Sequence, residues 1–327
     1  MSPLSPAKAP GSNLIGQRLT LRLRLPEGGF RDIVGTLESE RSIRKRDGSL
    51  VHFQPREVAV WREIVAVPDR AGRGAPLSLR IQEIELAASR TWPAKEEIQL
   101  GDWILRASGK FTKRANSVLA IGSPGSDIDM AIKEVIEFYT SRNLPPIFHI
   151  ALPTYFELGN HLRNQGWISD ISVNVMVADI VDVIGLWDSK GAESEYVREL
   201  VDAPGEEWIS LQNDQGVLEI MNRFPARYAS LRLTGVLVAV GRASNFGKWT
   251  VLTRLFVHPD YRGRGIGREI ITFILQDALQ LGATKVALQV DGKNVGAIAL
   301  YEKMGFRLHH TYEYFSHKSE MEIARGC

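Results

Sequence analysis

The sequence has very little cysteine: its 327 residues include one, Cys327, which is also the last residue. A disulfide framework and a cysteine-based zinc site both need several thiols, so neither can form within one chain. We therefore assign no metal ligands and expect a reducing, cytoplasmic setting.

Long apolar runs are missing as well. Nowhere do apolar residues approach the roughly 20 in a row that span a bilayer. The first 13 residues are rich in Ser, Pro and Gly and hold no apolar core of the kind found in a signal peptide. We expect neither membrane insertion nor secretion, and we predict a flexible tail over residues 1–12.

An excess of one charge sign is also missing, because 40 Lys and Arg face 38 Asp and Glu and leave a formal net charge of +2. Binding to a phosphate backbone usually requires a strongly basic balance, so nucleic acid is not the expected partner. What remains is an ordinary globular composition, 44% hydrophobic and 24% charged. The length exceeds one ordinary core, so we expect more than one domain.

Short alternating runs separated by turn residues occupy residues 13–66 and predict a small antiparallel barrel that resembles an SH3-like domain. Three neighbouring cations, Arg44, Lys45 and Arg46, are either a patch for an anionic partner or the solvated tip of a hairpin. A Gly- and Pro-rich stretch predicts a linker over residues 67–77. Strands and helices alternate beyond it, which favours helices packed on a mixed sheet.

A glycine-rich loop is the strongest chemical motif in the chain. The apolar strand Leu252–Val257 leads through His258–Tyr261 into Arg262–Gly267, and a helical pattern follows until Gly282. Backbone N–H groups that converge at a helix start hold a doubly charged anion, so the loop predicts a pyrophosphate site. The spacing G-x-G-x-G differs from the dinucleotide fingerprint G-x-G-x-x-G, and no P-loop is present.

The segment Arg262–Gly267 matches the R/Q-x-x-G-x-G/A signature of the GCN5-related N-acetyltransferases (GNATs), and the chain resembles this family. A second signature of the family, N-x-x-A-x-x-L-Y-x-x-x-G-F, matches from Asn294 to Phe306. The resemblance implies an α/β (α+β) fold, a tandem GNAT-type acyl-CoA N-acyltransferase fold with mixed sheets after the SH3-like barrel. Residues 78–200 would form a degenerate GNAT-like half and residues 201–327 the catalytic half.

The resemblance implies acetyl-CoA as the donor and an amine as the acceptor. Backbone groups of three strand residues would pair with the pantetheine arm, namely Leu255, Phe256 and Val257. Seven loop amides would cradle the pyrophosphate, those of Arg262, Gly263, Arg264, Gly265, Ile266, Gly267 and Arg268. Asn294 would cap the next helix and lie near the pantetheine, although an N-cap alone also explains it.

Tyr301 is the predicted general acid. Coenzyme A leaves as a thiolate when an amine attacks the thioester, and a phenol beside the sulfur can donate a proton to it. A core aromatic residue is the alternative role for Tyr301. We expect direct attack in a ternary complex, because the sole thiol, Cys327, lies in a tail. Three groups could accept the proton of the amine, Glu219, His258 and Asp291.

A weak internal duplication is also predicted. Gly265 to Gly305 spans 40 positions and Gly125 to Gly166 spans 41, with the same order of strands and helices. This alignment puts Leu162 in the place of Tyr301 and Tyr155 in the place of Asn294, so the first half lacks the proton donor. Its loop, residues 122–126, has no arginine and precedes two acids, Asp127 and Asp129, which would repel pyrophosphate.

A further segment resembles the same tandem proteins without a chemical role that we can assign; it comprises Trp103, Arg106, Thr112, Arg114, Ala115 and Asn116. The expected enzyme is therefore an N-acetyltransferase acting on a primary amine. A small molecule, a peptide N-terminus and a protein lysine are all open as acceptors. The alternative function is a non-catalytic protein that senses acetyl-CoA or binds a partner.

Overall fold

The computed structural model describes residues 9–64, 69–109, 112–186, 195–211 and 218–317. Most of the predicted tail and Cys327 lie outside these residues. The chain divides into two compact units, Met1–Pro68 and Asp69–Cys327. Among the described residues, every helix is too short or too polar to cross a membrane.

The smaller unit is an antiparallel sheet of five strands in the order β4-β3-β2-β1-β5. Its elements are η1 (Ser12–Leu14), β1 (Arg18–Arg24), β2 (Phe30–Ser39), β3 (Ser42–Arg44), β4 (Leu50–His52), η2 (Pro55–Glu57) and β5 (Val58–Glu63). Alternate residues of β1, among them Leu19, Leu21 and Leu23, enter a common core. The predicted strands are confirmed, while the SH3-like character of this unit stays a prediction.

The basic cluster of this unit is partly neutralised. Arg44 donates to the carboxylate of Glu38 at 2.8 Å and to the carbonyl of Gly48 at 2.9 Å. Both partners lie within the same hairpin region, so the charge of Arg44 serves the local structure. This pairing favours the solvated hairpin tip over a patch for an anionic partner.

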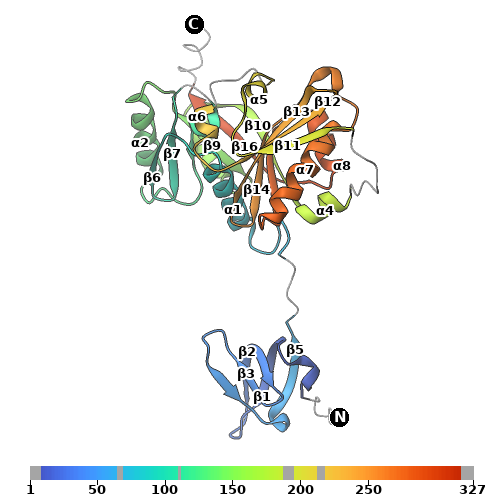
Figure 1. The fold of residues 1–327 in the computed structure, drawn as a ribbon. Helices are drawn as coiled ribbons and strands as arrows, with labels where there is room; N and C mark the ends of the chain where they lie inside the picture. Colours follow the sequence, from blue (N-terminus) through green and yellow to red (C-terminus); the bar gives the residue numbers. More distant parts are fainter. Residues whose placement is uncertain (1–8, 65–68, 110–111, 187–194, 212–217, 318–327) are drawn as a thin grey trace. The chain divides into compact units, whose positions relative to one another are not determined.

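The larger unit contains one mixed sheet of eleven strands in the order β11-β12-β13-β14-β15-β10-β16-β9-β8-β7-β6 (Figure 1). Its first elements are α1 (Leu77–Arg90), β6 (Glu96–Leu100), β7 (Trp103–Ala107), η3 (Lys113–Ala115), β8 (Val118–Leu119), α2 (Ile128–Thr140), β9 (Ile147–Leu152), α3 (Phe156–Asn164), β10 (Trp167–Asp179) and α4 (Ile180–Gly185). The rest are β11 (Val197–Val201), α5 (Glu206–Leu211), α6 (Leu218–Met221), β12 (Arg227–Leu233), β13 (Val236–Phe246), β14 (Trp249–Val257), η5 (Pro259–Tyr261), α7 (Ile266–Gln280), β15 (Lys285–Asp291), α8 (Val295–Lys303) and β16 (Arg307–His317).

The two halves of this sheet exchange their last strands. Strand β10 closes the first half in sequence, yet it pairs with β15 from Val173–Asp291 to Asp179–Lys285. Strand β16 closes the second half, yet it pairs with β9 of the first half. The exchanged strands also pair with each other along Trp167–Val177. The predicted boundary at residue 200 falls inside β11, which pairs with β12 of the second half.

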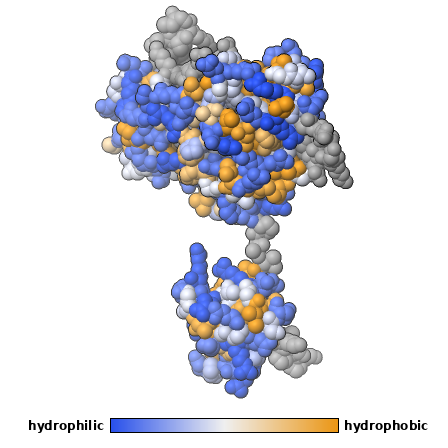
Figure 2. Space-filling model, in the orientation of Figure 1, coloured by the Kyte–Doolittle hydropathy of each residue, from blue (hydrophilic) through white to orange (hydrophobic). Residues whose placement is uncertain are grey.

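Helices pack on the sheet through their apolar faces, as hydropathy periodicity predicts. Helix α7 buries Ile270, Ile271 and Ile274 against β12–β15, and α2 buries its own apolar face against β7 and β9. Helix α1 packs over the central exchanged strands (Figure 1). Figure 2 shows that apolar residues form small patches among hydrophilic ones on the visible face of each unit.

Residues predicted as a linker are in part packed onto the larger unit. Ala71 is fully buried, and its N–H donates to Asp179 at 2.8 Å. Arg70 pairs with Asp182 at 2.7 Å, and a side chain at Gly72 would meet the ring of His309. Composition predicted a linker because the stretch is rich in Gly and Pro, but Arg70, Ala71 and Gly72 lie against α4, β10 and β16.

A buried polar cluster joins α1 to the centre of the sheet. The carboxylate of Glu85 lies 2.9 Å from His310 Nε2 and 3.2 Å from His149 Nε2. His310 Nδ1 lies 2.8 Å from His309 Nδ1, so one of these two nitrogens donates to the other. Burial, with contributions from His310, Arg80 and Arg307, lowers the pKa of His309 to about 4. His309 is therefore neutral in the folded protein near pH 7.

This pKa makes stability depend on pH in a defined direction. The pKa of His309 is about 4 when folded against an ordinary value of 6.5, so the unfolded chain takes up the proton first as the pH falls. Between pH 7.5 and 4.5, we expect the free energy of unfolding of the wild type to fall by about 2 kcal/mol more than that of the His309→Gln variant. Chemical denaturation of both proteins at the two pH values measures this difference. Equal losses in both proteins would contradict the assignment.

Candidate active site

Two parallel strands separate to open the site. The β14–β15 ladder runs from Trp249–Lys285 to Leu252–Leu288, and both strands continue beyond it, to Val257 and Asp291. Backbone groups on the continuing part of β14 thus face away from β15. Leu255, Phe256 and Val257, expected to meet the pantetheine arm, all lie on this part and line a cavity of about 750 Å³.

The glycine loop forms the far end of this cavity. Gly263 and Gly265 have φ values of 78° and 82°, a region that favours glycine. Gly265 is the residue immediately before α7, so its conformation sets where the helix begins. Gly267 has a different reason to be glycine, because a Cβ there would lie 2.9 Å from the Leu300 side chain. No heavy atom of the described residues lies within 4 Å of a Cβ built at Gly263 or Gly265, so a ligand has room there.

The structure narrows the set of amides that could hold a pyrophosphate. The N–H of Arg262 already donates to Pro259 at 3.2 Å, and that of Arg268 to Gly265 at 3.0 Å. The amides between them, from Gly263 to Gly267, include the first donors of α7, which have no partner inside a helix. Arg262 and Arg264 direct side-chain N–H groups to the carbonyls of Val257 and Asp260.

Asn294 and Tyr301 lie where α8 meets this cavity. Asn294 caps α8, because its side chain accepts from the N–H of Ala297 at 3.1 Å. Tyr301 is 8% exposed and packs 5.8 Å from the ring of Phe306. Burial raises the pKa of Tyr301 to about 12, so the phenol stays protonated near neutral pH. Both the core role and the cavity role proposed for this ring are thus compatible with its position.

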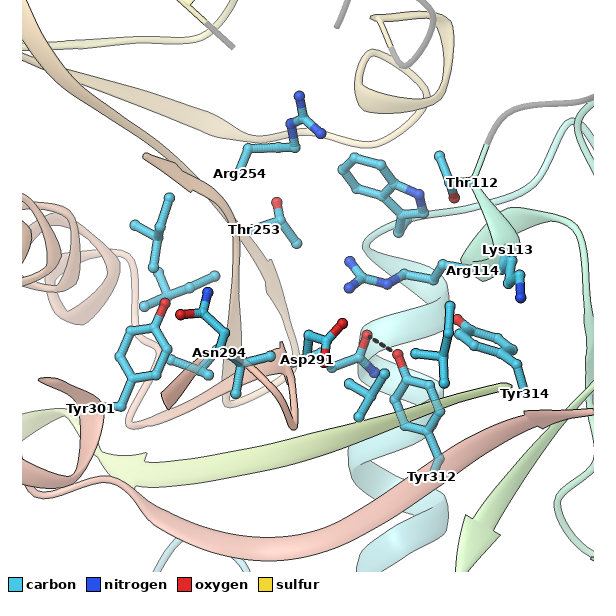
Figure 3. A pocket seen from close by; sticks show the side chains of 18 of the residues that line it. Thr112, Lys113, Arg114, Thr253, Arg254, Asp291, Asn294, Tyr301, Tyr312 and Tyr314 are labelled. Carbon is cyan, nitrogen blue, oxygen red and sulfur yellow. Dashed lines mark hydrogen bonds between the residues drawn. The ribbon is translucent and has the colours of Figure 1, made fainter. Parts of the chain in front are cut away.

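A second cavity, of about 710 Å³, adjoins the first. Four residues line both, namely Leu255, Phe256, Asn294 and Tyr301. Figure 3 shows Tyr301 at one side of this second cavity and Arg114 and Tyr314 at the other. Its walls come from both halves of the sheet, from η3 and β16 as well as from β14 and β15.

The three expected proton acceptors occupy different places. Asp291 lines the second cavity at the end of β15. Glu219 is exposed and pairs with Lys95 and Arg223, at 3.3 and 3.0 Å. His258 caps η5 and lies 3.7 Å from the carboxylate of Asp260. Neither Glu219 nor His258 lines either cavity. Of the three, the structure brings Asp291 together with Tyr301 and Asn294.

The corresponding loop of the first half is occupied by its own chain. Asp127 caps α2 by accepting from the N–H groups of Asp129 and Met130. The N–H of Gly122 donates to the hydroxyl of Tyr155 at 2.7 Å, and that of Ser123 donates to Asp102 at 2.8 Å. Several N–H groups in and beside this loop are therefore satisfied within the protein, and the degenerate character of this half stays a prediction.

Several cavity residues were not found from the sequence. Arg254 stands at a register shift where Gly241 of β13 faces two residues of β14, and its φ is 57°. Trp92, Tyr312 and Tyr314 also line the second cavity. Tyr312 and Tyr314 stand at alternate positions of β16, which places them on one face of the sheet. This alternation was the available signal, but it does not indicate which face lines a cavity.

Parallel strands that separate beside a glycine loop and a helix start define a GNAT acetyltransferase. The solved structure of a GCN5-related N-acetyltransferase from Kribbella flavida shares this fold, with a TM-score of 0.58 and 14% identity over 72% of this chain and 95% of that one. The chain belongs to the family described as "Probable histone acetyltransferase Rv0428c C-terminal", which matches residues 79–315. It is therefore an acyltransferase that uses acetyl-CoA as its acetyl donor, and the non-catalytic alternative is not supported.

Two relatives match more than two thirds of this chain. The "Probable histone acetyltransferase Rv0428c" of Mycobacterium tuberculosis is 26% identical over 321 residues, which is 93% of this chain and 96% of that protein. The "Uncharacterized N-acetyltransferase YobR" of Bacillus subtilis is 28% identical over 238 residues, 69% of this chain and 94% of that protein. These similarities support the enzyme class and leave the acceptor unspecified.

The positive φ of Gly265 gives a direct test of the loop. Gly265→Val places a branched side chain at φ 82°, which costs at least about 1–2 kcal/mol if the loop is kept. We expect the loop to shift and the Kd for coenzyme A to rise about 10-fold or more. Calorimetric titration with coenzyme A measures this change. Gly185→Ala is the control, because that position is open and lies at the end of α4. Equal affinities in the two variants would count against the loop as the binding site.

Proposed function

We propose that this chain transfers the acetyl group of acetyl-CoA to a primary amine by direct attack of the amine in a ternary complex. The observation that carries the proposal is the junction of the two cavities at Tyr301 and Asn294. One cavity contains the glycine loop and the other adjoins it at the shared residues, so donor and acceptor can be bound together. Acetyl-CoA, when bound, supplies an activated acyl group as a thioester.

The residues proposed to bind the donor act through their backbone. Leu255, Phe256 and Val257 offer N–H and C=O groups on a strand edge left open by the separation from β15, as an added strand would require. The amides from Gly263 to Gly267 provide donors for the pyrophosphate at the positive end of α7. Arg262, Arg264 and Arg268 add positive charge around this loop, and Asn294 fixes the start of α8 beside it.

Two side chains are proposed to move protons. Asp291 accepts a proton from the amine, directly or through one water, because an ammonium group has no lone pair with which to attack. A C–N bond then forms as the C–S bond breaks, and Tyr301 donates its phenolic proton or a hydrogen bond to the leaving sulfur. No acyl-enzyme is invoked, because direct attack by the amine needs no nucleophile from the chain.

Tyr301→Phe tests the acid. The substitution keeps the ring in the core but removes the hydroxyl, so we expect kcat to fall about 100-fold while the affinity for coenzyme A is retained. The wild-type rate should rise with pH as the substrate ammonium loses its proton. Because the pKa of Tyr301 is about 12, loss of the phenolic proton should not lower the rate up to about pH 10. Thiol release across a pH series measures both effects. A variant with wild-type kcat would remove Tyr301 from the mechanism.

Asp291→Asn tests the proton acceptor. We expect kcat at pH 7 to fall about 100-fold and to recover in part at high pH, where the free amine no longer needs a base. Glu219→Gln is the matched control, because Glu219 is exposed and lines neither cavity, and it should keep the wild-type rate. The idea fails if both variants lose activity equally or if the Asp291 variant shows an unchanged pH profile.

We further propose that the larger unit arose by duplication and that residues 13–66 form an SH3-like barrel in a cytoplasmic protein. Two similar units support the duplication, since β8–α2–β9 and β14–α7–β15 each join a parallel pair of strands through one helix. Superposition of these two units would test it, because unrelated units would align over the helix alone. The single cysteine supports a reducing compartment, which fractionation of cells that express the protein would test.

A further inference from the structure

The acceptor cavity, as we call the second cavity, has an unusual charge for a site that receives an amine. Its lining includes three cations, Lys113, Arg114 and Arg254, and one carboxylate, Asp291. The lining therefore carries three formal positive charges and one negative charge, a net charge of +2. A simple ammonium substrate would be repelled by this wall, so the cavity is matched to an amine that also carries negative charge.

The segment that bears Lys113 and Arg114 is held by specific bonds. Thr112 has a φ of 56° and its hydroxyl accepts from the N–H of Ala115 at 3.3 Å. The amide of Asn116 accepts from the N–H of Ser108 at 2.7 Å and donates to the carbonyl of Thr112 at 3.0 Å. These contacts fix η3 and direct its cations to the cavity (Figure 3). The segment that resembled the tandem proteins thus has a structural role, because it positions Arg114 at the cavity.

Arg114 is held in the cavity by aromatic contacts. Its guanidinium lies 5.6 Å from the centre of the Trp92 ring. Arg114 lines the same cavity as Tyr312 and Tyr314, where burial raises the pKa of both phenols and the positive charge of Arg114 acts against this rise. Among the described residues, no carboxylate forms an ion pair with Arg114. Its charge is therefore available to a ligand.

Arg254 reaches the same cavity from the other half of the sheet. It belongs to the bulge of β14, where two residues oppose one on β13, and bulges redirect side chains. Its φ of 57° is costly for a residue other than glycine. Strained backbone of this kind concentrates at functional sites. Figure 3 shows Arg254 at the top of the cavity and Arg114 extending from the right toward its centre.

We propose that the acceptor is a small amine that carries an anionic oxygen group, a carboxylate or a phosphate, which Arg114 and Arg254 bind while the amine faces Asp291 and Tyr301. This inference rests on the proposed function. A guanidinium presents N–H groups in a planar fork that matches either anion. The cavity volume of about 710 Å³ suits a small molecule. Amino acids and short peptides with a free carboxylate belong to this class, as do phosphorylated amines.

A lysine-rich tail, the acceptor implied by the name of the Mycobacterium tuberculosis relative, does not fit this wall. Such a tail carries the same sign of charge as Lys113, Arg114 and Arg254. Like charges brought together at a binding site reduce affinity by several kcal/mol when they are desolvated. The cavity therefore selects against polycationic acceptors.

The test compares acceptors that differ in one charge. The full chain is supplied with acetyl-CoA and with several L-amino acids, each alongside its α-carboxamide, and thiol release gives kcat/KM. A carboxamide lowers the pKa of the neighbouring amine, so intrinsic reactivity near neutral pH favours the uncharged compound. We nevertheless expect the carboxylates to be preferred by about 10- to 100-fold. Phosphoethanolamine against ethanolamine forms the phosphate arm, and a lysine-rich peptide forms the cationic arm.

Substitutions of the two arginines test whether they cause the preference for anionic acceptors. Arg114→Gln and Arg254→Gln should each lower kcat/KM for the charged acceptor about 10- to 100-fold, mainly through KM, and change the value for its uncharged analogue less than twofold. Arg254→Lys keeps the charge and should restore part of the preference. Arg232→Gln is the control, because Arg232 lies on β12, pairs with Glu207 at 2.6 Å and lines neither cavity. Thermal unfolding of each variant confirms that it is folded.

The outcomes separate the two proposals. Equal use of charged and uncharged amines, a preference for the lysine-rich peptide, or equal losses for both acceptors in the Gln variants would overturn the anionic acceptor and leave amine acetylation intact. If no amine in the panel stimulates thiol release while coenzyme A still binds, the proposed function fails, and the anionic-acceptor inference fails with it. Preference for phosphoethanolamine over every carboxylate would assign the anion as phosphate.

Discussion

The exchange of β10 and β16 is the interaction on which the rest of the larger unit depends. Each half gives its last strand to the other, so eleven strands form one sheet whose centre is shared. Backbone hydrogen bonds fix the register along Trp167–Val177. This register places the η3 segment of one half opposite β14 of the other. The acceptor cavity therefore requires both halves, although only the second half lines the cavity that contains the glycine loop.

The first half lines the acceptor cavity but not the cavity that contains the glycine loop. In the second half, positive φ angles at Gly263 and Gly265 leave open space and donors at the start of α7. In the first half, Asp102 accepts from the N–H of Ser123, and Asp127 and Tyr155 accept from N–H groups on either side of this loop. The first half is thereby free to provide a wall of the site, and Arg114 is its contribution. Proposed selectivity thus draws on both halves, through Arg114 of the first and Arg254 of the second.

Local motifs were predictable from the sequence because their chemistry is local. The glycine loop, helix α7 with its buried Ile271 and Ile274, strand β15 and the N-cap Asn294 all depend on neighbouring residues. Long-range features were not predictable in this way. The strand exchange, the packing of Ala71 and the bulge at Arg254 depend on partners distant in sequence. Arg114 stood out as part of a motif, but its role required the three-dimensional position of Trp92 and Tyr314.

The shared centre of the sheet also orders events during synthesis. Strand β10 ends at Asp179, yet its partners Lys285–Asp291 and Arg307–His317 lie more than 100 residues later in the sequence, since 285 minus 179 is 106. Until they are synthesised, both edges of a thirteen-residue strand await hydrogen-bond partners, and such edges attract other chains. Contacts this distant in sequence also slow folding. The first half alone therefore lacks both native partners of β10.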